Sequence, residues 1–218
     1  MHHSVARRYS AMVRMRSAAP SGRSSAASIF FILGCAAVAL AGSARGVSAS
    51  DRPAPGPDAR LRAVLSEQRE HMIDRLHAYW TRGDFVQNPD PKGGPGNFIL
   101  DDRGTPCPLA SIIIESGRRD LVQEAARTNN NVKIVDLRDG PVLDWILSSG
   151  LTQEECVLIQ QPSRSGEAAA PIVRRQESER LAEQLSQVEQ TLRASSERSL
   201  TVALKRLQAT LHARTPRV

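Results

Sequence analysis

The sequence predicts a mainly α protein: a small bundle of short helices with at most one or two short strands, followed by a long C-terminal helix or coiled-coil segment. Three observations support this fold class. Apolar residues recur at helical spacing through most of the chain after residue 57. Capping residues, prolines and glycines mark the ends of these stretches. Finally, leucines repeat every three or four residues through residues 171–218.

Composition divides the 218 residues into five segments. The first is a signal peptide or an N-terminal anchor, and a Pro-rich spacer follows it. A compact helical domain, a polar linker and an amphipathic helical or coiled-coil tail complete the chain. In order, these segments span residues 1–49, 50–57, 58–162, 163–170 and 171–218.

The N-terminal segment has the three parts of a secretory signal peptide. Six arginines come without any acidic residue, an apolar run covers residues 29–41, and small residues lead to a cleavage site near Ala49. The run is shorter than the roughly 20 residues that a membrane span needs. We therefore expect export to the periplasm or the extracellular space. Retention of the run as an anchor, or acylation of Cys35 in a lipobox-like sequence, would attach the protein to a membrane instead.

Charge does not favour a nucleic-acid partner. The whole chain has a formal charge of +6, from 29 basic and 23 acidic residues. All of that excess comes from the six arginines of the leader, so residues 51–218 hold 23 of each sign. A neutral chain lacks the basic surface that binds a phosphate backbone.

The domain is predicted to begin with a long helix over residues 58–82. Asp58 can cap its first turn, and Gly83 can end it. A loop follows over residues 88–96, where three prolines and three glycines exclude regular structure. Residues 98–100 are expected to form a short strand or an extended piece.

Two short helices are expected next, over residues 107–116 and 120–128. The first is apolar enough to be buried, although its three adjacent isoleucines would equally suit a strand. Residues 132–137 fit either a short strand or a turn of helix.

Two further helices are predicted from residues that typically begin or end a helix. One begins at Pro141 and ends at Gly150. Thr152 and Glu155 have the spacing of a capping box, which predicts another helix over residues 153–160.

The tail is predicted to be helical, with an apolar seam along one face. Serines interrupt this seam, so the tail is either one long helix with a discontinuity or two helices that meet near residues 194–197. Such helices need packing to persist. The partner would be a second copy, another helical protein or the chain's own domain. The seam consists of Leu181, Leu185, Val188, Leu192, Leu200, Leu204, Leu207 and Leu211.

Several motifs of the domain occur together. They are RLHAYW at 75–80 with Gly83, FILDDRGTPC at 98–107 with Leu109 and Ala110, Ser116-Gly117, Trp145, SGLT at 149–152 with Glu155, and Ile159-Gln160. As a set they resemble a family of uncharacterised exported bacterial proteins. The resemblance does not extend to the leader or the tail. It implies a bacterial, exported protein, and it implies no activity.

Cys107 and Cys156 are the only cysteines after the leader. An even pair in an exported protein fits a disulfide, which would contribute about 3–4 kcal/mol. Two buried thiols fit equally well, because Cys156 lies among apolar residues. A third interpretation makes Cys107 a nucleophile near a helix start beside Arg103, with His71 or His77 as its base.

Two polar clusters could bind a metal. Glu70, Asp74 and His77 share one face of the first helix, but they lack any known metal-site spacing, so a solvated polar face is the favoured interpretation.

The second cluster is the turn Asp101-Asp102-Arg103-Gly104. It lacks the repeated oxygen ligands of a calcium loop. A plain turn is therefore favoured, held by an aspartate side chain and with positive φ at Gly104. We expect neither a metal nor a cofactor.

These observations favour an exported, non-catalytic protein that acts as an interaction or structural module through its helical domain and its tail. One alternative is a small hydrolase that uses Cys107 with His71 or His77. Another is a membrane-anchored envelope protein, which retention of the leader or acylation of Cys35 would produce.

Overall fold

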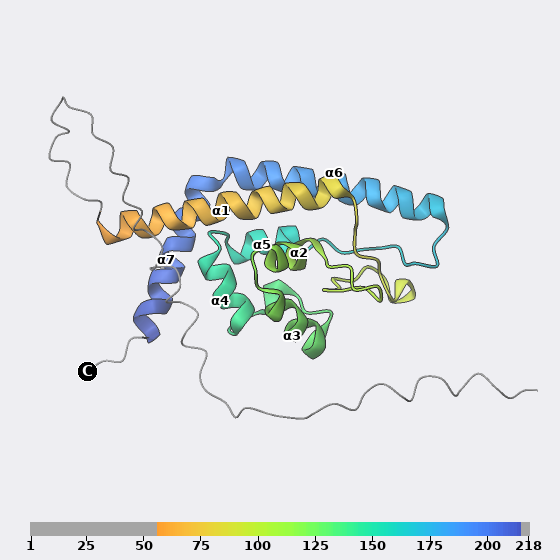
Figure 1. Ribbon diagram of the computed structural model, residues 1–218, viewed down its shortest axis with the longest axis horizontal. Coiled ribbons are helices and arrows are strands. Elements are labelled where there is room, and N and C mark those ends of the chain that lie inside the picture. The colour runs from red at the N-terminus through yellow and green to blue at the C-terminus, as the bar shows by residue number, and fades with distance from the viewer. Residues whose placement is uncertain (1–55, 215–218) are drawn as a thin grey trace, which may run out of the picture. The chain divides into compact units, whose positions relative to one another are not determined.

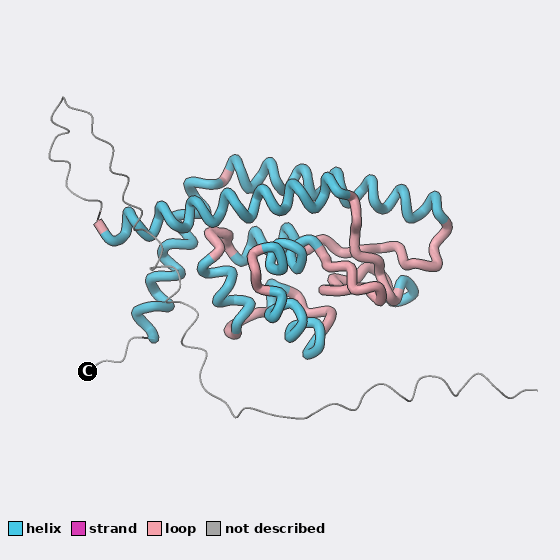
Figure 2. Tube along the Cα trace, in the orientation of Figure 1, coloured by secondary structure: helices cyan, strands magenta, loops and turns pink. Residues whose placement is uncertain are grey.

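Residues 56–214 are described by a computed structural model, and they form a mainly helical unit (Figure 2). Seven α-helices and two short 3₁₀ helices make up this part of the chain. Within it the backbone forms no strand, and only two isolated bridges join extended residues. The predicted fold class is therefore confirmed. The leader, including the apolar run at 29–41 and Cys35, lies outside the described residues.

Two long helices form one layer of the unit. α1 (Pro57–Arg82) and α6 (Pro171–Ala194) pack side by side and run in opposite directions (Figure 1). α7 (Ser196–Arg214) turns away from the axis of α6 and packs against α1 and α4. The short helices lie to one side of the long pair: α2 (Pro108–Glu115), α3 (Arg119–Asn129), α4 (Pro141–Ser148) and α5 (Gln153–Ile159).

α1 begins one residue earlier than predicted. Pro57 occupies its first turn, where the fixed φ of proline suits a helix start. Asp58 does not cap the helix, which corrects the prediction. Its carboxylate instead accepts a hydrogen bond from Nε2 of Gln208 on α7, at 2.8 Å. Gly83 ends the helix as expected, in the left-handed region at φ 73°.

Of the two possibilities for residues 98–100, the structure has the extended piece and not the strand. The Ile99 N–H donates to the Asn130 carbonyl, and the Ile99 carbonyl accepts from the Cys107 N–H, both at 2.8 Å. Because these hydrogen bonds go to two separate segments, the extended piece has no partner strand. Of the two possibilities for residues 132–137, the structure has a single turn of 3₁₀ helix, η3 (Ile134–Asp136).

The residues predicted to begin and end the short helices do so in the structure. Thr152 Oγ1 accepts from the Glu155 N–H at 3.2 Å, and the Glu155 carboxylate accepts from the Thr152 N–H at 2.9 Å, which completes the capping box. Gly150 has a φ of 77°, and a Cβ there would lie 2.1 Å from the Leu65 carbonyl oxygen. Glycine is therefore required where the turn between α4 and α5 meets α1.

The predicted linker does not separate two units. The Asn88 N–H donates to the Ser165 carbonyl at 2.9 Å, and Gly96 and Ser163 exchange two backbone hydrogen bonds at 3.2 Å. Ser163 and Ser165 are also buried. Residues 163–170 are thus fixed to the loop at 88–96. The expected domain and tail pack into one compact unit.

The tail forms two helices, with the break at Ser195. The α6 part of the apolar seam belongs to the same core as Met72 and Leu76 of α1. The α7 part packs around Leu65 of α1. The seam is therefore covered by the chain's own helices, which is one of the three possibilities that the sequence left open. Two residues of the seam are not fully buried: Leu204 is partly buried, and Leu211 is exposed.

Arg69 of α1 is fully buried and holds these elements together. Its guanidinium donates to both carboxylate oxygens of Glu155, at 2.8 and 2.7 Å. It also donates to the carbonyls of Gly150 and Leu192 and, through Nε, to Oγ of Ser196. One side chain thereby joins α1 to the start of α5 and to the end of α6.

Two of the serines that interrupt the seam donate hydrogen bonds to Glu155. Its Oε1 accepts from the hydroxyls of Ser195 at 3.2 Å and Ser199 at 2.7 Å. Burial acts to raise the pKa of Glu155, but hydrogen bonds from Arg69, Ser199 and the Thr152 N–H outweigh it and lower the pKa. The carboxylate is therefore held in its charged form.

Among the helices of residues 56–214, none combines the length and apolar character that crossing a lipid bilayer requires.

Candidate ligand-binding pocket

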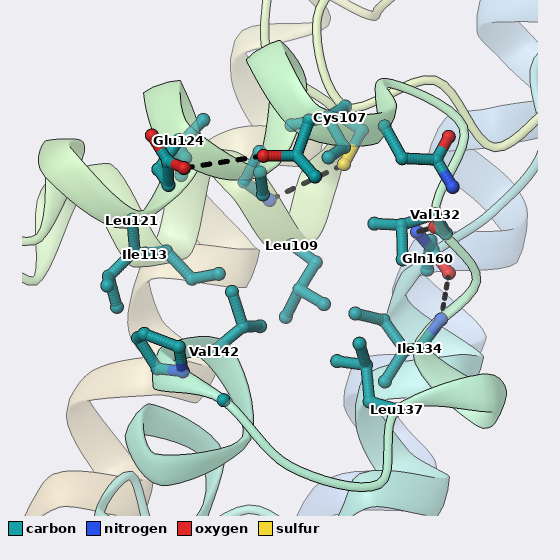
Figure 3. Close-up of a pocket in the computed structure, with 18 of the residues that line it drawn as sticks. Cys107, Leu109, Ile113, Leu121, Glu124, Val132, Ile134, Leu137, Val142 and Gln160 are labelled. Carbon is teal, nitrogen blue, oxygen red and sulfur yellow. Dashed lines mark hydrogen bonds between the residues drawn. The ribbon is translucent and has the colours of Figure 1, made fainter.

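A cavity of about 330 Å³ lies between α2, α3 and residues 132–142. Figure 3 shows Leu109 near its centre, with Ile113 and Leu121 on one side and Ile134 and Leu137 on the other. The volume falls near the small end of the roughly 300–1,000 Å³ that is usual for ligand pockets. The cavity is therefore large enough for a small molecule or for one part of a larger one.

Local sequence explains the apolar wall. α2 begins after Cys107, whose Sγ accepts the Ala110 N–H at 3.4 Å, and Pro108 occupies its first turn. Its apolar run then places Leu109 and Ile113 in the wall of the cavity. The opposite wall comes from residues 132–137, which pack against the core and contain the single 3₁₀ turn η3.

The two polar side chains of the inner wall already have partners. Oε1 of Gln160 accepts from the Ile134 N–H at 3.0 Å, and its Nε2 donates to the Val132 carbonyl at 2.8 Å. The Cys107 thiol is engaged by Ala110. Each polar side-chain atom of the inner wall therefore already has at least one partner within the chain.

Polar residues gather at the open edge. Glu124, Thr128, Asn129 and Asp139 line the cavity and are exposed. Thr128 donates to Glu124 at 3.4 Å (Figure 3). The pocket thus has an apolar interior and a polar mouth, the arrangement that suits a molecule with one apolar end.

Comparison with protein-family models, curated proteins and solved structures finds no match to this chain. The resemblance to exported bacterial proteins therefore stays a prediction, and the chemistry of the site is argued from its own residues.

The motifs that carry that resemblance have structural partners. The Tyr79 hydroxyl donates to the Pro106 carbonyl at 3.0 Å, and Nε1 of Trp145 donates to Ser116 Oγ at 3.0 Å. Glu155 binds the buried arginine. These residues hold the fold together, so the motifs describe how the unit is built.

The candidate disulfide between Cys107 and Cys156 is not formed. Cys107 and Cys156 are both free and buried. Cys107 is held at the start of α2, facing the pocket, whereas Cys156 lies inside α5 and is fully covered. This arrangement is the second of the interpretations that the sequence left open.

Neither thiol is activated. Burial raises the pKa of Cys107 to about 11, against partial compensation by the Ala110 and Leu109 N–H groups. Burial and the neighbouring charges of Glu155 and Glu154 raise the pKa of Cys156 further. At neutral pH only about one Cys107 in ten thousand would be a thiolate, and the thiolate is the nucleophile.

The histidines proposed as bases for Cys107 lie elsewhere. His71 is exposed on α1. His77 Nδ1 lies 3.0 Å from a carboxylate oxygen of Glu189 on α6, and its ring packs edge-on against Trp80. No histidine lines the cavity that holds Cys107. The structure therefore does not bring together the dyad of the hydrolase interpretation.

The carboxylates near His77 are used in ion pairs. Arg193 lies 3.2 Å from Asp74 and 3.6 Å from Glu70, and it also pairs with Glu189. Within residues 56–214, no group of three potential ligands is placed to bind a metal ion. The polar face of α1 thus contacts α6, where the sequence predicted contact with solvent only.

The aspartate turn is formed as predicted. Oδ1 of Asp101 accepts from the backbone N–H groups of Arg103 at 2.9 Å and Thr105 at 2.8 Å. Gly104 has a φ of 79°, and Asp102 is exposed. Burial acts to raise the pKa of Asp101, but these hydrogen bonds, with those from Gln87 and the Arg103 side chain, lower it.

The pocket itself was not predicted. A usable signal was present: Val132, Ile134 and Leu137 are apolar residues in a segment without helical or strand periodicity. Such a segment can cover the apolar surface of neighbouring helices and leave a cavity between itself and them. Nothing in the sequence indicates which helices this segment contacts.

Proposed function

We propose that this protein is an exported, non-catalytic binding protein that holds a small apolar molecule, or the apolar part of a larger one, in the pocket. The observation that carries the proposal is an apolar cavity whose inward polar groups, Gln160 and Cys107, already have partners. Such a wall offers a ligand mainly hydrocarbon contacts. Export is supported by the composition of residues 1–49.

The volume of the cavity limits the size of the ligand. At about 30 Å³ for each non-hydrogen atom, 330 Å³ holds about eleven such atoms. A chain of eight carbons fits within that space. Burying it would contribute about 6 kcal/mol at about 0.8 kcal/mol per methylene. Ordering costs reduce this figure, so we expect a dissociation constant of about 0.1–1 mM for such a probe.

The arrangement of other groups supports binding over catalysis. The thiol in the pocket has a raised pKa and no histidine beside it. The carboxylates at the mouth are exposed. The hydrogen bonds from Arg127 lower the pKa of Glu124, which moves it away from the neutral range that a general acid or base needs.

The test is an NMR titration of the protein with 1-octanol, followed through backbone amide shifts. Ala125 lines the pocket on α3, and Gln123 lies exposed on the same helix away from it. We expect Ala125→Trp to abolish saturable binding by filling the cavity, and Gln123→Trp to leave it unchanged. Thr128→Trp, at the exposed mouth, blocks entry without disturbing the core.

Saturable binding that is lost in both pocket variants and kept in Gln123→Trp supports the proposal. The proposal is overturned if 1-octanol causes no saturable shifts, or if Ala125→Trp and Thr128→Trp bind it as well as the unchanged protein does. Circular dichroism of each variant establishes that the comparison is made between folded proteins.

A further inference from the structure

One wall of the pocket is formed by residues 132–137, called here the wall segment. Val132, Ile134 and Leu137 line the cavity, whereas the side chain of Val135 is exposed. The backbone hydrogen bonds made within the segment are local: the Leu137 N–H, for example, donates to the Ile134 carbonyl at 3.2 Å. Local bonds of this kind shape the segment, but they do not fix its position against the neighbouring helices.

Two glutamine side chains of α5 join the wall segment to that helix. Gln160 accepts from the Ile134 N–H and donates to the Val132 carbonyl (Figure 3). Nε2 of Gln153 donates to the carbonyls of Ile134 at 2.8 Å and Leu137 at 3.0 Å. The two glutamines are seven residues apart, about two helical turns, so they project from the same side of α5. Together they hold the segment near both of its ends.

Gln153 acts on the pocket without lining it. Its side chain is partly buried and is not among the residues that line the cavity. Both carbonyls that it holds belong to residues whose side chains do line the cavity. We infer that Gln153 is a positioning residue of the pocket, which keeps Ile134 and Leu137 in place and thereby sets how tightly an apolar ligand is held. This inference rests on the proposed function, because it concerns the same cavity.

Preorganisation of the wall is the physical reason for the expected effect. A wall that is free to move must be ordered when the ligand binds, and that ordering reduces the affinity. A typical hydrogen bond changes an equilibrium about two- to tenfold. Without the Gln153 donors, the wall segment is held at the Gln160 end while the Leu137 end is released. We therefore expect the affinity for an apolar ligand to fall about three- to tenfold.

The experiment is an NMR titration of three variants at position 153 with 1-octanol. Gln153→Met and Gln153→Glu keep a side chain of similar length and remove its N–H donors. Gln153→Lys keeps a donor. We expect the dissociation constant to rise about three- to tenfold in the first two variants and to be restored, at least in part, by lysine. The matched control is Gln161→Met, because the Gln161 amide donates to the Leu158 carbonyl of α5 and not to the wall segment.

A second measurement, native-state amide hydrogen exchange, needs no ligand. Release of the wall segment should speed exchange of the Ile134 and Leu137 amides in Gln153→Met. Exchange of the Ile73 amide, in the buried part of α1, should change little. A general loss of stability would speed exchange at all three positions together, so the comparison separates positioning of the wall from support of the whole fold.

The outcomes separate this inference from the proposed function. If 1-octanol does not bind to the unchanged protein, the proposed function fails and this inference fails with it. If the unchanged protein binds 1-octanol, and Gln153→Met and Gln153→Glu bind it equally well, the pocket stands and the role of Gln153 is overturned. That role is also overturned if Gln161→Met weakens binding as much, or if exchange at Ile73 accelerates as much as exchange at Leu137.

Discussion

Replacing Arg69 with methionine should destabilise the protein more than any change to a surface ion pair. Arg69 is fully buried and its partner Glu155 is nearly so, with side-chain exposures of 0% and 8%. Methionine keeps much of the length of the side chain and removes the charge. The variant leaves a buried carboxylate without its counter-ion and removes the arginine donor from the Gly150 carbonyl. The Leu192 carbonyl also loses Arg69, but it still accepts from the hydroxyls of Ser195 and Ser196.

The expected loss of stability depends on the buried groups that lose Arg69 as their partner. Removing one partner of a buried ion pair typically costs about 3–5 kcal/mol. The hydroxyls of Ser195 and Ser199 and the Thr152 N–H still solvate Glu155, so we expect the lower half of that range. A domain has about 5–15 kcal/mol of total stability, so the loss is a large part of it. For a chain of this size, a loss of 3–4 kcal/mol corresponds to a fall in Tm of about 6–16 °C.

The assay is urea unfolding followed by circular dichroism at 222 nm. Arg62→Met is the matched control, because Arg62 is on the same helix and pairs with Glu197 at 2.8 Å, but that pair is exposed. We expect the control to lose less than about 1 kcal/mol. A loss below about 1 kcal/mol for Arg69→Met, equal to the control, would refute the reasoning that this pair holds α1, α5 and α6 together.

Three further predictions follow from the same structure. The pKa values of Glu155 and Asp101 are lowered in the folded protein, so their contribution to stability is complete above about pH 5 and is lost as the pH falls through the folded values; a urea midpoint that stays flat from pH 7 to pH 3 would contradict this. Cys107 and Cys156 should react slowly with iodoacetamide in the folded protein, and each should take one adduct after unfolding without reductant, as read by intact mass; a missing pair of adducts would indicate a disulfide. Because the apolar seam is buried within the chain, light scattering should give the mass of a monomer at micromolar concentration, and a stable dimer would show that another surface associates.

Much of the fold could be predicted because local signals decide it. Prolines at helix starts, the capping box at Thr152 and Glu155, and the glycine at position 83 set the ends of helices through backbone chemistry alone. The leucine spacing gave the helices of the tail. Asp58 was misassigned because proline at the preceding position starts the helix earlier and frees the aspartate for a contact with α7.

Long-range contacts were the part that could not be predicted. Arg69 looks like any arginine on a helix, and nothing local shows that it is buried against Glu155. The serines of the tail were visible as an interruption of the seam, but their role as donors to a buried carboxylate depends on how α6 and α7 meet α5. The same holds for residues 163–170, whose polar composition suggested a free linker although their backbone is fixed to another loop.

The candidate site depended on such contacts as well. Cys107 was identified as a residue of interest, but its position in an apolar wall, away from any histidine, is a consequence of how α2 packs against α3 and residues 132–142. Spacing between two cysteines carries no information about whether they meet, and here they do not bond.

The most direct test of the binding proposal is to locate a bound octyl chain through nuclear Overhauser effects between 1-octanol and the methyl groups of the protein. The account predicts contacts to Leu109, Ile113 and Val142, which line the pocket. Contacts to the exposed side chains of Ile172 and Val173 alone, or no intermolecular contacts at millimolar 1-octanol, would contradict it.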